Sequence, residues 1–61
     1  MKPKAKVTGE NGNTMNVLCI CTKVLKDAGK KDKIKELTER VFNAESYEDA
    51  IKIMGEYCEL Y

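Results

Sequence analysis

The fold of this 61-residue chain is decided by the stretch TMNVLCICTKVLKDAG, residues 14–29. Apolar side chains recur there three and four residues apart, which is the spacing that lines one face of a helix. That face consists of Val17, Leu18, Cys21, Val24, Leu25 and Ala28. Asn13 or Thr14 can cap the start of the helix, and Gly29 suits the left-handed position that follows a helix end. The spacing therefore predicts a helix that buries one side.

An alternative structure for the first half of this stretch is a β-hairpin. Asn11-Gly12 is a strong signal for a type I′ turn, and Met15, Val17 and Cys19 alternate as a second strand would. The apolar spacing, however, continues through Leu25 and is followed by the Gly29 stop signal. This continuation favours the helix.

Two further helices are predicted after Gly29. Asp32 can cap the first, which ends near Asn43, and Ser46 can cap the second, with Asp49 three residues later as a variant of the capping box. Glu36 and Arg40 are placed to pair four residues apart on the first of these helices. The expected apolar faces are Ile34, Leu37, Val41 and Ala44 in the first helix, and Tyr47, Ala50, Ile51, Met54, Tyr57 and Cys58 in the second.

The two ends of the chain complete the predicted fold. Ala5–Thr8 alternates apolar and polar residues, which predicts a short strand. Residues 57–61 either continue the third helix or form a strand that pairs with it, which would place Glu59 near Lys4. We therefore expect a mainly α, compact three-helix domain with a short N-terminal strand, alone or paired with a C-terminal strand. Residues 1–61 form one domain in this prediction, with residues 1–4 disordered.

Composition excludes several classes of protein. Eleven Lys and Arg residues against ten Asp and Glu give a formal net charge of +1, which argues against a dedicated polybasic nucleic-acid binder. No apolar run approaches the roughly 20 residues that span a bilayer, and the start lacks the apolar core of a signal peptide, so we expect no membrane association. The chain has no histidine, which excludes His-dependent catalytic triads and His–metal sites. We expect no metal ion and no cofactor.

The three cysteines indicate a cytoplasmic protein with reduced thiols, because small secreted domains usually have an even number. Cys21 and Cys58 are predicted to be small core residues. Cys19 falls on the polar face near Lys23 and Lys26, whose charges favour a reactive thiolate. A surface cysteine is the preferred interpretation, because no general base accompanies it. We therefore predict no catalytic residue and no enzymatic activity.

The loop formed by residues 9–13, Gly-Glu-Asn-Gly-Asn, precedes the first predicted helix. Glycine amides at a helix start can bind a phosphate group. The glycine spacing, however, matches no nucleotide-binding motif, and Glu10 would repel an anion. A turn between strand and helix is the preferred interpretation.

Two surfaces are candidates for binding. Lysines gather at the turn between the first two predicted helices, at Lys30, Lys31, Lys33 and Lys35. They either form a solvated face or bind nucleic acid weakly through phosphate groups. Near the C-terminus, Met54, Tyr57 and Tyr61 are candidates for a protein-interaction patch, provided that the small core leaves them exposed.

Three segments together resemble a family of small uncharacterised bacterial and phage-borne proteins. The segments are Val7–Asn13, Leu25–Gly29 and Ala44–Ala50. The family pattern is a strand, a G-x-x-G-N turn, a helix ending in A-L-x-x-A-G, a second helix, and a segment with Ser and Tyr or Asp that opens a third. The resemblance covers residues 6–60. It implies a cytosolic accessory or mobile-element context, and it assigns no function and no site residue.

This sequence departs from the family at two places. Val24-Leu25 stands where the family has Ala-Leu, and Cys58-Glu59 stands where the family ending is rich in valine. The second difference argues against a C-terminal strand.

The expected function is a non-enzymatic protein–protein interaction or accessory module that binds another protein or a second copy of itself. Apolar residues beyond the predicted helix faces, such as Met15 and Leu60, support this expectation. The alternative is a weak nucleic-acid-binding accessory protein that uses the lysine cluster.

Overall fold

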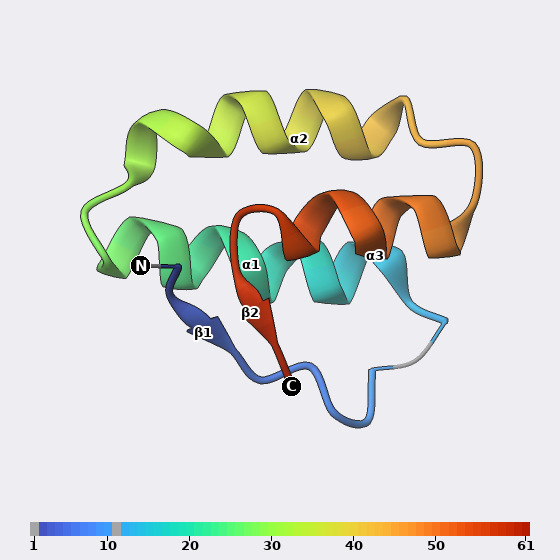
Figure 1. The fold of residues 1–61 in the computed structure, drawn as a ribbon, viewed down its shortest axis with the longest axis horizontal. Coiled ribbons are helices and arrows are strands. Elements are labelled where there is room, and N and C mark those ends of the chain that lie inside the picture. Colours follow the sequence, from blue (N-terminus) through green and yellow to red (C-terminus); the bar gives the residue numbers. More distant parts are fainter. Residues whose placement is uncertain (1, 11) are drawn as a thin grey trace.

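The computed structural model describes residues 2–10 and 12–61, and Figure 1 shows its ribbon. Helix α1 spans Thr14–Asp27, α2 spans Ile34–Phe42 and α3 spans Tyr47–Gly55. A short 3₁₀ helix, η1, spans Lys31–Lys33, and two strands, β1 at Lys4–Ala5 and β2 at Glu59–Leu60, lie side by side near the ends of the chain. Each of the three α-helices contacts the other two. The prediction of a mainly α, three-helix domain is confirmed, including the C-terminal strand.

Helix α1 has the two ends that its sequence predicts. The side-chain oxygen of Asn13 accepts a hydrogen bond from the backbone N–H of Asn16 at 3.1 Å. At the other end Gly29 adopts a φ of 76°, and Lys30 N–H donates to the carbonyl of Leu25. This pattern is the Schellman motif, in which a left-handed residue satisfies the last carbonyl groups. Met15, Val17 and Cys19, the second strand of the alternative hairpin, therefore lie within a helix.

The start of α2 differs from the prediction. Asp32 does not cap this helix, because it lies inside η1, and α2 follows η1 directly at Ile34. Lys33, the residue before α2, makes no side-chain cap hydrogen bond. The preceding 3₁₀ turn, closed by the bond from Lys33 N–H to the carbonyl of Lys30, leads into the helix without a side-chain cap. Helix α2 ends at Phe42, with Asn43 as its C-cap, close to the predicted end.

Helix α3 begins at the predicted cap. The hydroxyl oxygen of Ser46 accepts a hydrogen bond from the backbone N–H of Asp49 at 3.1 Å. The Asp49 carboxylate accepts in turn from the backbone N–H of Glu45 at 3.3 Å, one residue before the cap. The prediction that Ser46 caps α3 is therefore confirmed. The Asp49 side chain, however, bonds the backbone N–H of Glu45 and not that of the cap residue, as a standard capping box would. Glu48 and Asp49 also place negative charge in the first turn, where the helix dipole favours it.

The core is formed by all three α-helices and both ends of the chain. Among the residues that the structure describes, ten form this buried core: Ala5, Val17, Leu18, Cys21, Leu25, Leu37, Val41, Ala50, Met54 and Cys58. Most of the residues predicted to face inward are among them. Ala28 is an error of the prediction, since it is exposed. It follows the last residue of α1 as the C-cap, so the chain has already left the helical path there.

The two strands pair in parallel, with Lys4 opposite Glu59 and Ala5 opposite Leu60. The pairing extends beyond the two residues of β1, because the N–H groups of Val7 and Thr8 both donate to the carbonyl of Tyr61. Strand β1 thus starts one residue before the predicted strand Ala5–Thr8 and is shorter than it. It pairs with the expected C-terminal segment. The prediction of a disordered start at residues 1–4 does not hold for Lys4, which lies in β1. Met1 lies outside the described residues.

Candidate functional site

A pocket of about 300 Å³ lies where the N-terminal segment, the turn after α1 and the end of α3 meet α2. Its lining brings together residues from distant parts of the sequence. They are Lys2, Leu25, Lys30, Lys33, Glu36, Arg40, Glu56 and Tyr57. Six of these eight side chains carry a formal charge. We call this site the basic pocket, because four of the charged side chains are cationic and two are anionic.

Arg40 and Glu56 form a two-pronged ion pair on the wall of the basic pocket. Nη1 of Arg40 lies 2.8 Å from Oε1 of Glu56, and Nη2 lies 3.1 Å from Oε2. Two parallel bonds of this kind hold a guanidinium in one orientation. The predicted pairing of Arg40 with Glu36 is therefore wrong: the partner comes from the C-cap of α3 and not from the same helix.

Tyr57 connects this ion pair to the second carboxylate. Its hydroxyl oxygen accepts a hydrogen bond from Nη1 of Arg40 at 3.2 Å, and its hydroxyl group donates to Oε2 of Glu36. The guanidinium carbon of Arg40 also lies 5.7 Å from the centre of the tyrosine ring, within the range of a cation–π contact. Both carboxylates of the pocket thus have a partner within the same network.

The network keeps its charges fixed near neutral pH. The hydrogen bonds from Arg40 hold the pKa of the Glu56 carboxyl below its usual value. The same bonds, first to Glu56 and then to Tyr57, raise the pKa of the Arg40 guanidinium above its usual value. Arg40 and Glu56 are therefore both ionised at pH 7, and neither side chain gains or loses a proton easily there.

The remaining cations of the pocket come from two other segments, the N-terminus and the turn that contains η1. Lys2 is fixed by a hydrogen bond from its ammonium group to the carbonyl of Gly55 at 2.8 Å. Lys30 follows the end of α1, and Lys33 is the last residue of η1. Because the four cations outnumber the two carboxylates by two, the described lining of the basic pocket has a net positive charge.

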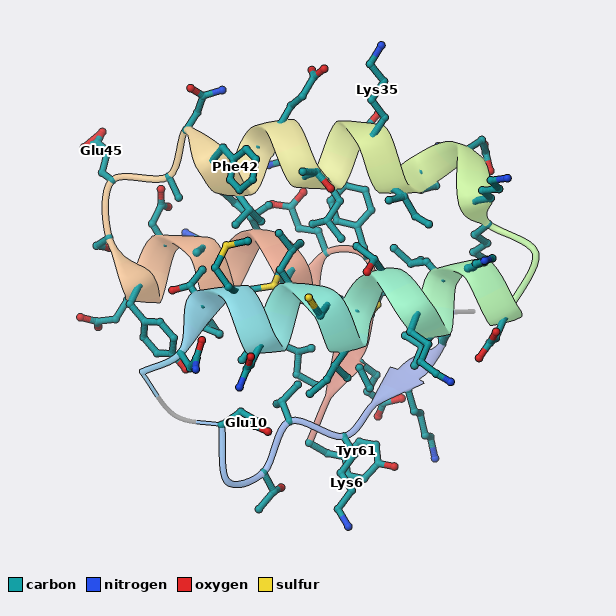
Figure 2. The ribbon with its side chains drawn as sticks, turned by 180° about the vertical axis from the view of Figure 1, so that it is seen from behind. Lys6, Glu10, Lys35, Phe42, Glu45 and Tyr61 are labelled. Atoms are coloured by element: carbon teal, nitrogen blue, oxygen red, sulfur yellow. The ribbon has the colours of Figure 1, made fainter. Side chains whose placement is uncertain are left out.

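The predicted lysine cluster is divided by the structure. Lys30 and Lys33 line the basic pocket, whereas Lys31 and Lys35 are exposed and do not line it. Figure 2 shows Lys35 pointing outward from α2. Because the chain winds through η1 and α2, lysines that are close in the sequence lie on different sides of these helices. Sequence reasoning missed the contribution of Arg40, and only its status as the single arginine marked it as unusual.

The predicted patch of Met54, Tyr57 and Tyr61 does not form a surface. Met54 is fully buried, so it cannot contact a partner directly. Tyr57 is half-buried and bonded within the basic pocket. Tyr61 is 58% exposed but lies beside the strands, on the opposite side of the molecule from the exposed Phe42, as Figure 2 shows. The patch prediction fails because α3 turns Met54 into the core.

The cysteines follow the prediction for packing. All three are free thiols; Cys19 is exposed, and Cys21 and Cys58 are buried. Burial, with a smaller effect of Cys58, raises the pKa of the Cys21 thiol to about 12, and burial also raises the pKa of Cys58. A thiol that resists ionisation is a poor nucleophile. Cys21 and Cys58 therefore act as small core residues.

The loop before α1 has the geometry of a turn. Gly9 and Gly12 adopt φ values of 93° and 82°, which are conformations that glycine tolerates well. The carboxylate of Glu10 accepts a hydrogen bond from the side-chain amide of Asn16 at 3.3 Å, so a negative group lies close to the start of α1. This placement supports the turn interpretation; Asn11 lies outside the described residues.

Two further features of the described residues bear on the kind of site. No group of three or more Cys, Asp or Glu side chains with metal-binding geometry occurs within residues 2–10 and 12–61. None of the helices in that part of the chain combines the length and the apolarity needed to cross a bilayer.

Comparison of the chain with protein-family models, with curated proteins and with solved structures finds no match. The resemblance to small bacterial and phage-borne proteins therefore stays an expectation. The candidate site is defined by the geometry of the basic pocket alone.

Proposed function

We propose that this protein is a non-enzymatic interaction module that binds an acidic segment of a partner protein at the basic pocket. The observation that supports this proposal is the convergence of Lys2, Lys30, Lys33 and Arg40 on one concave site, from the N-terminal segment, the turn that contains η1, and α2. Positive charge gathered in a pocket attracts and orients anionic groups of a partner.

The chemistry of the pocket supports binding over catalysis. General acid–base catalysis needs a group whose pKa lies near the working pH. In the basic pocket, Arg40 holds the Glu56 pKa low, and Glu36 accepts a hydrogen bond from Tyr57. The buried thiols have raised pKa values and lie in the core. The charged side chains of the basic pocket are therefore arranged to hold charge in place, as a binding site requires.

The proposed setting of the module is the cytoplasm, because three free thiols, two of them in the core, are typical of a reducing compartment. The bacterial or phage-borne context implied by the resemblance belongs to the same proposal. Self-association is an alternative form of the interaction, since Phe42 and Met15 are large apolar side chains that are 65% and 51% exposed.

The proposal is tested by titrating the protein with a short peptide of alternating Glu and Gly, and with the matching Lys–Gly peptide, by isothermal calorimetry at low salt. We expect only the acidic peptide to bind. The Lys33→Glu variant should lose about tenfold in affinity, because it replaces an attractive charge in the pocket with a repulsive one.

Lys35→Glu is the matched control, since Lys35 is an exposed lysine on α2 that does not line the pocket. It should change the affinity by no more than about twofold. Equal binding of both peptides, or equal effects of the two variants, would contradict the proposal. Sedimentation at several concentrations separates self-association from binding to a different protein.

A second candidate function is weak binding of nucleic acid, which the exposed lysines Lys31, Lys33 and Lys35 favour. Phosphate groups along a duplex contact a broad surface, so Lys31→Glu and Lys35→Glu should then weaken binding as much as Lys33→Glu does. Retardation of duplex DNA in a gel should also fade steeply as salt rises. No retardation at low salt would remove this candidate.

A further inference from the structure

The lining of the basic pocket has an excess of two positive charges, and this excess indicates the kind of anion that it accommodates. A carboxylate brings one negative charge. A phosphate monoester brings about 1.5 to 2 negative charges at pH 7, together with three strong acceptor oxygens. We infer that the basic pocket binds a phosphorylated side chain of the partner protein, an inference that rests on the proposed function.

The arrangement of the cations supports a phosphoryl group over a flat carboxylate. Arg40 is held against Glu56 and Tyr57, so its guanidinium is fixed in one orientation and its charge is paired with the Glu56 carboxylate. Lys2 comes from the N-terminal segment, and Lys30 and Lys33 come from the turn between α1 and α2. A lysine ammonium is a compact charge with three N–H donors, so the bond from Lys2 to Gly55 uses only one of its three. Cations from separate segments can each bond a different phosphate oxygen, whereas a carboxylate offers only two oxygens.

The size and walls of the pocket indicate a single terminal group. Its volume of about 300 Å³ lies at the lower end of the range for ligand sites. Leu25 adds an apolar wall and Tyr57 an aromatic ring, against which the carbon stem of a phosphorylated side chain can pack. A nucleic-acid backbone carries one charge per phosphate along an extended chain, whereas a pocket of this volume has room for a single phosphate group.

The inference is tested with three peptides of one acidic sequence that carry Ser, Glu or phosphoserine at the central position. Binding is measured by calorimetry and by the amide chemical shifts of the full chain. We expect the phosphoserine peptide to bind about tenfold more tightly than the Glu peptide, and the Ser peptide to bind most weakly. Inorganic phosphate alone should shift the resonances of Lys33 and Tyr57 at higher concentration.

Matched variants test whether the basic pocket causes the tighter binding of the phosphoserine peptide. Lys33→Ala should remove most of the preference for phosphoserine over Glu, Lys33→Arg should restore it, and Lys35→Ala should leave it unchanged. Because Lys33 and Lys35 are both exposed, neither change should unfold the domain, and circular dichroism checks this.

The other outcomes separate the two proposals. Equal affinity for the Glu and phosphoserine peptides, with dependence on Lys33, would overturn the phosphate inference and leave the proposed function intact. No binding of any acidic peptide would overturn both. Binding of inorganic phosphate with no gain for the phosphopeptide would identify a free-anion site and contradict the inference. Tighter binding of duplex DNA than of the phosphopeptide would replace both proposals with the nucleic-acid function.

Discussion

The thiol of Cys58 donates to the backbone carbonyl of Cys21, with 3.8 Å between the sulfur and oxygen atoms. This contact joins the centre of α1 to the residue that precedes β2, and both side chains are fully buried. The end of the chain is therefore packed directly onto the first helix. Because both thiols lie in the core as neutral groups, their ionisation opposes folding.

The first prediction concerns stability at high pH. The pKa of Cys21 is about 12 in the folded protein, against an ordinary value of 9.0. Between these values the unfolded chain binds fewer protons than the folded chain, so the free energy of unfolding falls as pH rises from about 9 toward 12. The contribution of Cys21 to this slope reaches about 1.4 kcal/mol per pH unit. Urea unfolding at a series of pH values measures it.

Cys21→Ala isolates this effect, because the variant has no thiol to ionise at that position. Its free energy of unfolding should fall less steeply above pH 9 than that of the parent protein, even though the lost packing lowers its stability at every pH. Cys19→Ala, which changes an exposed thiol, should keep the parent slope. Identical slopes in all three proteins would contradict the assignment.

The second prediction compares two methionines. Met54 is fully buried in α3, and Met15 is 51% exposed in α1. Met54→Ala should lower the free energy of unfolding by about 2–5 kcal/mol, because it leaves a cavity in the core. Met15→Ala should change it by no more than about 0.5 kcal/mol. Chemical unfolding followed by circular dichroism measures both, and similar values for the two variants would show that the core is assigned wrongly.

The third prediction tests the helix caps. Ser46→Ala should lower the free energy of unfolding by about 1 kcal/mol, because the N–H of Asp49 loses its acceptor at the start of α3. Ser46→Asp should retain most of the stability, since aspartate also caps well. Asp32→Ala serves as the comparison and should have little effect, because Asp32 caps no helix. A larger loss for Asp32→Ala than for Ser46→Ala would contradict the observed start of α2.

The fourth prediction compares two glycines. At Gly29 the φ of 76° is strained for any side chain, so Gly29→Ala should lower the free energy of unfolding by roughly 1–2 kcal/mol. Gly55 is the last residue of α3, and a Cβ atom there would meet nothing within 4 Å. Gly55→Ala should therefore raise stability by roughly 0.5–1 kcal/mol. Thermal unfolding of the two variants gives opposite shifts if both assignments are right.

Local patterns accounted for much of the fold. The spacing of Val17, Leu18 and Cys21 predicted the buried face of α1, and Asn13 and Gly29 marked its ends, because caps and amphipathic faces depend on residues within a few positions of one another. The same reasoning failed at Asp32, where a 3₁₀ turn provides the start that a cap was expected to provide.

The candidate site was predicted only in part. Lys30 and Lys33 belonged to the predicted cluster, but Arg40 did not. Sequence spacing paired Arg40 with Glu36 on one helix, whereas the folded chain pairs it with Glu56, sixteen residues away. No local rule indicates which of two carboxylates an arginine will contact once two helices pack together.

The amino-acid order alone therefore specified three amphipathic helices, most of their ends and most of the buried residues, because these properties depend on short-range spacing and on capping hydrogen bonds. The packing of the helices decided which side chains meet in the basic pocket. It also decided that Met54 is buried and that β1 pairs in parallel with β2. Contacts of this kind join residues far apart in the chain, and their free energy depends on the relative positions of whole elements.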